Sequence, residues 1–316
     1  MPIYIKVSLV VGDAMNQLEH LKNMTVVVAD TGDFDSIKQY MPTDATTNHS
    51  LILAAAKMEE YSSLIDRAIT DADHDLSLAL ELVFVYFGVE ILKIIPGRVS
   101  SEGDARLSFD AAASVVKAKH LIEHYEKAGT DRERILIKLA STWEGVAAAK
   151  QLEQEGIHCN MTLMFSLPQA VISADAGATL ISPFVGRILD WYVKNEQPQG
   201  YASHEDPGVL SVQSIYQYYK TFGYKTEVMG ASFRNKEEIL ELAGCDLLTI
   251  APKFLEQLKS SKAPVVKKLD ASKKASSLEK KIYSEEAFRF SLNEDPMATE
   301  KLAEGIRKFS ADIRLL

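Results

Sequence analysis

The sequence predicts a single α/β domain built as a (β/α)₈ barrel, a closed ring of eight parallel strands with extra helices attached. Eight short runs rich in β-branched residues alternate with longer helical patterns, and glycines follow several of these helical stretches. The length of 316 residues also suits one barrel, which commonly occupies about 250 residues and tolerates insertions.

The predicted strands, in chain order, are residues 25–30, 44–47, 97–102, 135–140, 159–165, 179–185, 226–233 and 247–252. Gly129 and Gly223 follow helical stretches and suit the left-handed position after a helix end. Ser141 and Glu144 form an S-x-x-E pattern after the fourth strand, which predicts a helix cap there. An open doubly wound sheet shares the βα repeat, but no glycine-rich nucleotide loop follows the first strand.

Several segments stand outside this repeat. Residues 48–96 are long enough for two or three helices, which is more than one crossover between strands needs. Residues 262–281 are polar and lysine-rich, which predicts a surface excursion before C-terminal helices at 284–316. Residues 1–14 are predicted to be an N-terminal extension that precedes a barrel domain of residues 15–316.

Composition excludes several classes of protein. A content of 47% hydrophobic and 25% charged residues is that of a globular protein, and a net charge of -9 makes nucleic acid an unfavourable partner. Cys159 and Cys245 lie far apart with no Cys/His cluster, so we expect no metal site and a reducing compartment. Signal-peptide and membrane-spanning patterns are absent from the sequence, which predicts a cytoplasmic protein with no membrane partner.

The fourth strand places one lysine inside the barrel. Side chains alternate between the two faces of a strand, so Leu136, Lys138 and Ala140 share the inward face if their apolar neighbours face the helices. Barrel active sites form at the carboxyl ends of the strands, where such side chains converge. The same alternation selects polar or cavity-lining residues around other strands: Asp30; Asp44, Thr46 and Asn48; Arg98, Ser100 and Glu102; Asn160 and Thr162; Ser182, Phe184 and Arg187; and Gly230, Ser232 and Arg234.

This set of side chains favours a ligand site with amine chemistry. Buried polar groups cost about 1–3 kcal/mol each when unpaired, so a ligand explains why many of them face the interior. A single amine among carboxylates and amides suggests an iminium intermediate. The lysine must lose its proton to act as a nucleophile, and burial favours that.

The strings VVADTGD (27–33), DATTN (44–48), ILKIIPGRVSSE (91–102), RILIKLASTWEG (134–145), GIHCNMTLMFS (156–166), SPFVGRILDWY (182–192) and VMGASFRN (228–235) closely resemble bacterial transaldolases of the long type. The similarity covers roughly residues 16–310 and implies a TIM barrel of class I, Schiff-base aldolase chemistry.

The resemblance implies a role for each matching residue. Lys138 corresponds to the Schiff-base lysine, Asp30 to the general acid/base of carbon–carbon cleavage, and Glu102 to a carboxylate that shuttles protons through a water held partly by Thr162. Residues implied or selected for substrate binding are Asn48, Thr46, Ser100, Asn160, Ser182 and Phe184, and those implied for a phosphate clamp are Arg187, Ser232 and Arg234.

The implied reaction belongs to the non-oxidative pentose phosphate pathway. It transfers a dihydroxyacetone unit from sedoheptulose 7-phosphate to glyceraldehyde 3-phosphate, giving erythrose 4-phosphate and fructose 6-phosphate. No metal or organic cofactor is implied, because the iminium serves as electron sink. Sugar phosphates are the expected partners, and similar enzymes are often homodimers.

The chain departs from the family pattern at two positions near these residues. His49 stands where proline usually follows DATTN, and Gly103 stands where a branched apolar residue usually follows the matching glutamate. Two other functions therefore stay open: an aldolase similar to the fructose 6-phosphate aldolases, which releases free dihydroxyacetone, and a barrel retained for binding after losing catalysis.

Overall fold

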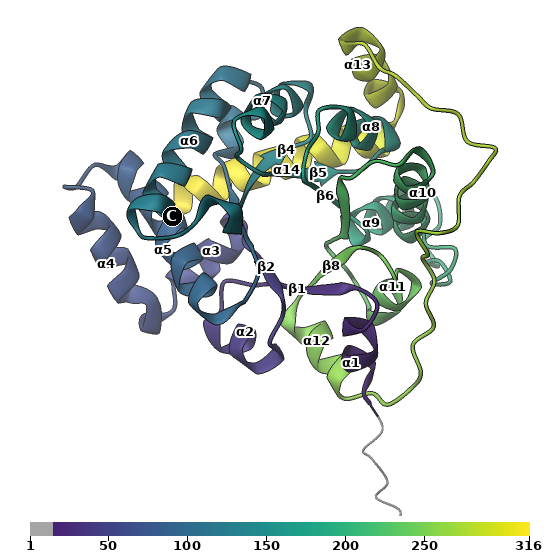
Figure 1. Ribbon diagram of the computed structural model, residues 1–316, viewed down its shortest axis with the longest axis horizontal. Helices are drawn as coiled ribbons and strands as arrows, with labels where there is room; N and C mark the ends of the chain where they lie inside the picture. Colours follow the sequence, from purple (N-terminus) through teal and green to yellow (C-terminus); the bar gives the residue numbers. More distant parts are fainter. Residues whose placement is uncertain (1–14) are drawn as a thin grey trace, which may run out of the picture.

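The computed structural model describes residues 15–316 and confirms the closed barrel (Figure 1). Its eight parallel strands are hydrogen-bonded in chain order, and β1 closes the ring by pairing with β8. The strands are β1 Val26–Asp30, β2 Asp44–Thr46, β3 Val99–Glu102, β4 Ile135–Ala140, β5 Cys159–Met164, β6 Leu180–Pro183, β7 Glu227–Gly230 and β8 Leu247–Ile250. Each lies within the run predicted for it, while the predicted extension at residues 1–14 lies outside the described residues.

Helices surround the ring of strands (Figure 1). They are α1 Gln17–Lys22, α2 Phe34–Tyr40, α3 His49–Ala56, α4 Ser62–Asp71, α5 Leu76–Ile94, α6 Ala111–Lys127, α7 Trp143–Gln154, α8 Leu167–Asp175, α9 Gly186–Asn195, α10 Pro207–Phe222, α11 Lys236–Glu241, α12 Pro252–Lys259, α13 Glu285–Glu294 and α14 Pro296–Leu315, with short 3₁₀ turns η1 Glu59–Tyr61, η2 Ala105–Leu107 and η3 Arg132–Arg134. The extra helices predicted between the second and third strands are α3, α4 and α5.

Apolar side chains fill the space between the strands and the helices. This main core is continuous around the ring and includes most of α5, which is too buried to be a surface helix. A separate layer fills the barrel interior and consists of Val28, Leu136, Leu180, Met229 and Leu247. The barrel is therefore a packed core with no pore through it.

A cluster of charged side chains closes the amino-terminal end of the barrel. Arg98 donates from Nε to Asp44 over 3.1 Å and from Nη1 to Glu227 over 2.8 Å. All three residues lie at or just before the starts of their strands, so they face the end of the barrel opposite to the strands' carboxyl ends. Asp44 and Arg98 point inward as predicted, but they contribute to this closure and not to the site at the mouth.

The prediction for the inward face of the seventh strand is wrong. Gly230 faces the helices, because a Cβ there would meet Leu248 at 2.8 Å and Leu242 at 3.3 Å, both of which belong to the outer core. Met229 faces the interior instead. Ser232 has a φ of 62°, so the backbone turns after the strand ends and simple alternation no longer applies.

The predicted cap after the fourth strand is displaced by one residue. Thr142, not Ser141, is the N-cap of α7, and its side chain accepts a hydrogen bond from the amide of Gly145. The Ser141 hydroxyl donates to the Thr162 carbonyl over 2.7 Å. In contrast, Gly129 and Gly223 take the left-handed conformations predicted for them, with φ of 81° and 72°.

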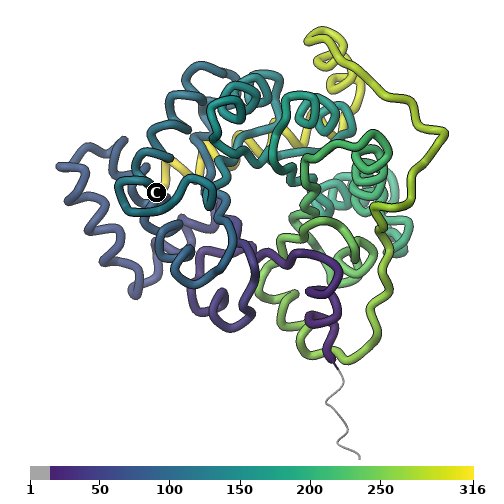
Figure 2. The backbone as a smooth tube through the Cα atoms, in the orientation of Figure 1, coloured from purple at the N-terminus to yellow at the C-terminus, as the bar shows by residue number. Residues whose placement is uncertain are grey.

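The C-terminal part of the chain wraps the barrel. Residues 262–281 contain no helix or strand and run along the outside of α11 and α10, as the long excursion in Figure 2 shows. After α13, helix α14 passes along the β4–β6 side of the barrel and contacts α3, α9, η2 and β5 (Figure 1). Gly305 permits this close approach, because a Cβ there would meet the side chain of Leu163 at 2.5 Å.

Candidate active site

A cavity of about 100 Å³ lies at the carboxyl ends of the barrel strands. Eight residues selected from the sequence line it: Asp30, Thr46, Asn48, Lys138, Ser182, Phe184, Arg187 and Ser232. Four other lining residues were not selected: Met229, Ala231, Thr249 and Phe309. The parallel strands therefore bring side chains from distant parts of the chain to one place, as the sequence predicted.

Lys138 is buried in this cavity. Its strand pairs with β3 and β5, so that Glu102 and Asn160 are its partners in register on either side. Its Nζ donates to the carbonyl of Thr47 over 3.0 Å, the one hydrogen bond that it makes to the described residues. It also lines a smaller adjoining cavity with Glu102 and Phe309.

Asp30, at the end of β1, is held by Thr46. The Thr46 hydroxyl lies 3.0 Å from Asp30 Oδ1 and 2.6 Å from the hydroxyl of Thr249. Burial raises the pKa of the Asp30 carboxyl above its usual value, although the charge of nearby Lys138 acts in the opposite direction. A carboxyl whose pKa is raised holds a proton more readily than a free carboxyl does, which suits a group that takes and returns a proton.

Glu102, at the end of β3, differs from Asp30 in its electrostatic surroundings. Burial would raise the pKa of this carboxyl, but Lys138 and then His49 lower it, and the result lies below the usual value. The barrel thus holds two buried carboxyl groups near one amine, with their pKa values shifted in opposite directions. Such a separation suits two different proton-transfer roles.

Asn160 anchors a short chain of hydrogen bonds across the barrel. Its amide nitrogen donates to the Ser100 hydroxyl over 3.0 Å, and its oxygen accepts from the Ser182 hydroxyl over 2.6 Å. Ser182 lines the cavity, whereas Ser100 and Asn160 are buried and do not line it. The hydrogen bond from Asn160 to Ser100 fixes the orientation of the Asn160 amide.

Two further selected residues offer free hydrogen-bonding capacity. The Thr162 hydroxyl is buried with no hydrogen-bond partner among residues 15–316, which is unfavourable unless a water or ligand binds there. Asn48 caps α3, since its side-chain oxygen accepts from the Leu51 amide over 2.9 Å. Its amide nitrogen is left as a donor at the edge of the cavity.

Arg187 and Arg234 occupy different environments near the mouth. The Arg187 guanidinium lies 4.9 Å from the Phe184 ring centroid and 5.6 Å from that of Phe309, and it lines the cavity. Burial lowers the pKa of Arg187, and the like charge of Arg234 adds to this effect. Arg234 lies outside the cavity lining and binds Asp190 with three hydrogen bonds of 2.6–3.1 Å.

Two residues that line the cavity, Thr249 and Phe309, were not predicted from the sequence, for different reasons. Thr249 shares the inward face of β8 with Leu247, so strand alternation could have found it. Phe309 comes from α14, and no local pattern indicates that this helix reaches the cavity. Among residues 15–316, no group of three or more His, Cys, Asp or Glu side chains could hold a metal ion, and no helix is long and apolar enough to cross a membrane.

Comparison with known proteins shows the family of the chain. Residues 27–316 match the family model described as transaldolase/fructose-6-phosphate aldolase. A transaldolase of Protochlamydia amoebophila is 59% identical over 308 residues, which cover 95% of this chain and 96% of that protein. A transaldolase of Sus scrofa is 58% identical over 93% of this chain and 90% of that protein, and a probable transaldolase of Drosophila melanogaster is 57% identical over 94% and 93%. The chain belongs to the transaldolase/fructose-6-phosphate aldolase family.

Proposed function

We propose that the protein is a transaldolase that moves a dihydroxyacetone unit from sedoheptulose 7-phosphate to glyceraldehyde 3-phosphate through an imine on Lys138. The products are erythrose 4-phosphate and fructose 6-phosphate. The observation that carries the proposal is a buried amine in a closed barrel with a carboxyl group on each of two nearby strand ends. The names of the relatives support the same activity.

Lys138 is the proposed nucleophile. In its neutral form, Nζ adds to the ketone carbonyl of the sugar, and loss of water gives a protonated imine. The carbon–carbon bond beyond the next carbon then breaks, and its electron pair moves into the imine to give an enamine. Asp30 takes the proton of the departing hydroxyl group, so that the shortened sugar leaves as an aldehyde. The enamine stays bonded to Lys138 until an acceptor aldehyde arrives.

Glu102 is the proposed proton carrier for imine formation and hydrolysis. It shares a cavity of about 20 Å³ with Lys138, which has room for one water molecule. The hydroxyl of Thr162, which is buried with no hydrogen-bond partner among residues 15–316, is proposed to help hold this water. Through such a water, Glu102 can remove and return the protons that the addition and loss of water require.

The remaining lining residues are proposed to hold the substrate. Asn48 and the Ser182–Asn160 pair offer polar groups to the hydroxyls of the three-carbon unit. Arg187, with Ser232 and Arg234 from the β7–α11 loop, is proposed to bind the phosphate, since guanidinium groups match phosphate oxygens bidentately. Homodimer formation and a cytoplasmic location, both expected from the sequence, stay predictions.

A coupled assay tests the function. With sedoheptulose 7-phosphate and glyceraldehyde 3-phosphate both present, we expect fructose 6-phosphate to form, and we expect no product when either sugar is left out. Lys138→Met protein is the matched control and should give none. If fructose 6-phosphate alone released free dihydroxyacetone as fast as transfer proceeds, the chain would be an aldolase. No turnover by folded protein would support a barrel that only binds.

A further inference from the structure

His49 is buried directly behind the proposed proton carrier. It is the first residue of α3, and only 2% of its surface is exposed. Its ring packs between Phe84 and Phe309, with centroid distances of 5.1 and 5.7 Å.

Two nitrogen atoms of this residue, the backbone nitrogen and the ring Nδ1, lie close to one oxygen of Glu102. The backbone N–H donates to Oε2 over 3.3 Å, and the ring Nδ1 lies 3.2 Å from the same atom. The ring contact has ion-pair distance but not the alignment of a linear hydrogen bond, and Nδ1 has no hydrogen-bond partner within residues 15–316. Proline at this position would remove both contacts.

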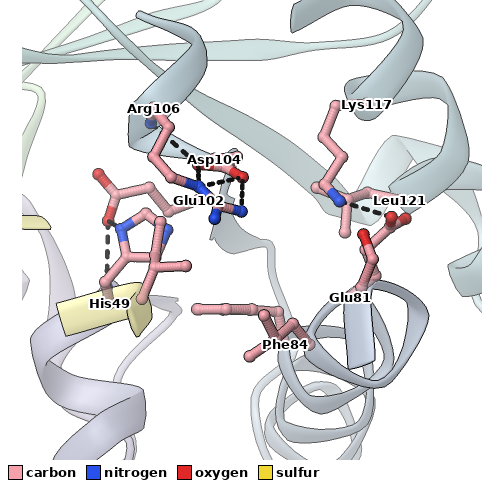
Figure 3. A pocket seen from close by; sticks show the side chains of 11 residues that line it. His49, Glu81, Phe84, Glu102, Asp104, Arg106, Lys117 and Leu121 are labelled. Atoms are coloured by element: carbon pink, nitrogen blue, oxygen red, sulfur yellow. Dashed lines mark hydrogen bonds and ion pairs between the residues drawn. The ribbon is translucent and has the colours of Figure 1, made fainter. Parts of the chain in front are cut away.

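Glu102 lies between two cavities. One is the small cavity that it shares with Lys138. The other, of about 30 Å³, lies on the His49 side and does not include Lys138 (Figure 3). His49 therefore contacts the carboxylate from outside the substrate cavity, where it cannot touch the sugar.

The other charged groups around this second cavity are already paired. Lys117 binds Glu81 and Arg106 binds Asp104, both over 2.5 Å, as Figure 3 shows. The charged or titratable groups that face His49 from the surrounding elements are Glu102 on β3, Glu81 on α5, Asp104 and Arg106 after β3, Lys117 on α6, and Asp312 on α14, which binds the adjacent Ser50. Glu102 is the carboxylate in direct contact with the ring.

We propose that His49 is a positioning residue for Glu102, which fixes the direction of the carboxylate toward Lys138. The proposal rests on the proposed transaldolase function. The electrostatics agree with this role. Burial raises the pKa of Glu102, but Lys138 and then His49 lower it, so that the pKa lies below its usual value. Gly103 leaves space beside Glu102, since a Cβ there would meet only Leu139 and the Lys138 carbonyl, both at 3.4 Å. The contacts from His49 therefore hold a carboxylate that the adjacent residue in the chain does not confine.

Two substitutions separate this role from simple packing. His49→Phe keeps an aromatic ring between Phe84 and Phe309 but removes the polar contact, and His49→Gln keeps a polar side chain but removes the imidazole ring. For each variant, kcat and KM of the transfer reaction are measured at pH values from 5.5 to 9. His124→Gln is the matched control, because His124 lies 3.9 Å from Glu81 and is not among the residues that line this cavity with Glu102.

For His49→Phe we expect kcat to fall about tenfold with KM changed less than about twofold, because a proton-transfer step and not binding is impaired. The acidic limb of the kcat profile should move up by about one pH unit, because His49 is among the causes that lower the pKa of Glu102. His49→Gln should recover most of kcat at high pH but keep the shifted limb. His124→Gln should match the unsubstituted protein in both respects.

An unchanged acidic limb in both variants would overturn the proposal, as would a loss of activity explained by KM alone. If His49→Phe fails to fold, the limb of His49→Gln decides the question by itself. Failure of the proposed function would look different, because the unsubstituted protein would then give no transfer product at any pH.

Discussion

Arg187 and Arg234 both lie near the mouth of the barrel, but they differ in how free each guanidinium is to bind a phosphate. Arg187 lines the cavity, and among the described residues no carboxylate forms an ion pair with it. Arg234 is about 40% exposed in its side chain and is bound by Asp190. A phosphate therefore finds Arg187 unpaired, whereas binding to Arg234 must compete with an existing ion pair.

We predict that Arg187→Ala raises the KM for fructose 6-phosphate more than Arg234→Ala does. Loss of a charged hydrogen bond of about 1.5–3 kcal/mol corresponds to roughly a 10- to 100-fold increase for Arg187, and we expect less than tenfold for Arg234. Steady-state kinetics of the two variants measure this directly. Asp190→Ala is a useful companion, because it frees Arg234 and should lower KM. A larger effect at Arg234 would contradict this account of the clamp.

For single residues, strand alternation predicts which side chains face inward, but it does not assign their roles. Lys138 was found because its strand is regular and its neighbours are apolar on the other face. Roles for Asp30 and Glu102 came from the resemblance, because alternation alone also selected Asp44 and Arg98 at the opposite end of the barrel. The predicted strand bounds place Asp44 and Arg98 near strand starts, and the structure shows them at the end of the barrel opposite to the cavity.

At the scale of elements, local sequence patterns did not predict where β7 ends or how α14 packs against the barrel. The predicted strand was twice as long as the observed one, and the left-handed residue Ser232 reverses the alternation beyond it. Ser232 nevertheless lines the cavity, because the same turn directs it there. The contribution of α14 depends on packing between distant parts of the chain, and the glycine that permits its approach carries no distinctive local signal.

The loop that follows β7 is held by a buried carboxyl pair. Glu238 on α11 accepts from the Arg234 amide over 2.7 Å. Burial raises the pKa of Glu238 to about 7 from a usual 4.5, and the nearby carboxylate of Asp206, the N-cap of α10, contributes to the rise. A carboxyl whose pKa is higher in the folded state stabilises the fold when protonated, and this stabilisation is lost as pH rises through the folded-state value.

We therefore predict that Glu238 makes the protein less stable at pH 8 than at pH 5, by at most about 3 kcal/mol at 1.36 kcal/mol per pKa unit. Glu238→Gln keeps the acceptor for the Arg234 amide but does not titrate, so its free energy of unfolding should depend less on pH. Denaturant unfolding at both pH values measures the difference. Glu237→Gln, at an exposed neighbouring position, is the control and should follow the unsubstituted protein. Parallel pH dependence of all three proteins would contradict the prediction.

At the scale of the whole molecule, the fold was the most predictable feature. Eight strands in a closed parallel ring follow from a repeated strand–helix pattern, since each repeat packs in the same way on the next. The path of residues 262–281 along the outer helices was predicted only as a polar excursion. The barrel brings Lys138 close to Asp30 and Glu102 although they lie far apart in the chain, and this proximity is what the proposed chemistry needs.

Chemical trapping of Lys138 tests the central claim most directly. The protein is treated with borohydride in the presence of fructose 6-phosphate, digested, and mapped by mass spectrometry. We expect a three-carbon adduct on the peptide containing Lys138 and on no other lysine. Lys138→Met should abolish trapping, and Lys150→Met, at an exposed position on the following helix α7, should leave it intact. A reduced sample of active protein with no sugar fragment on Lys138, or with the fragment on another lysine, would contradict the account.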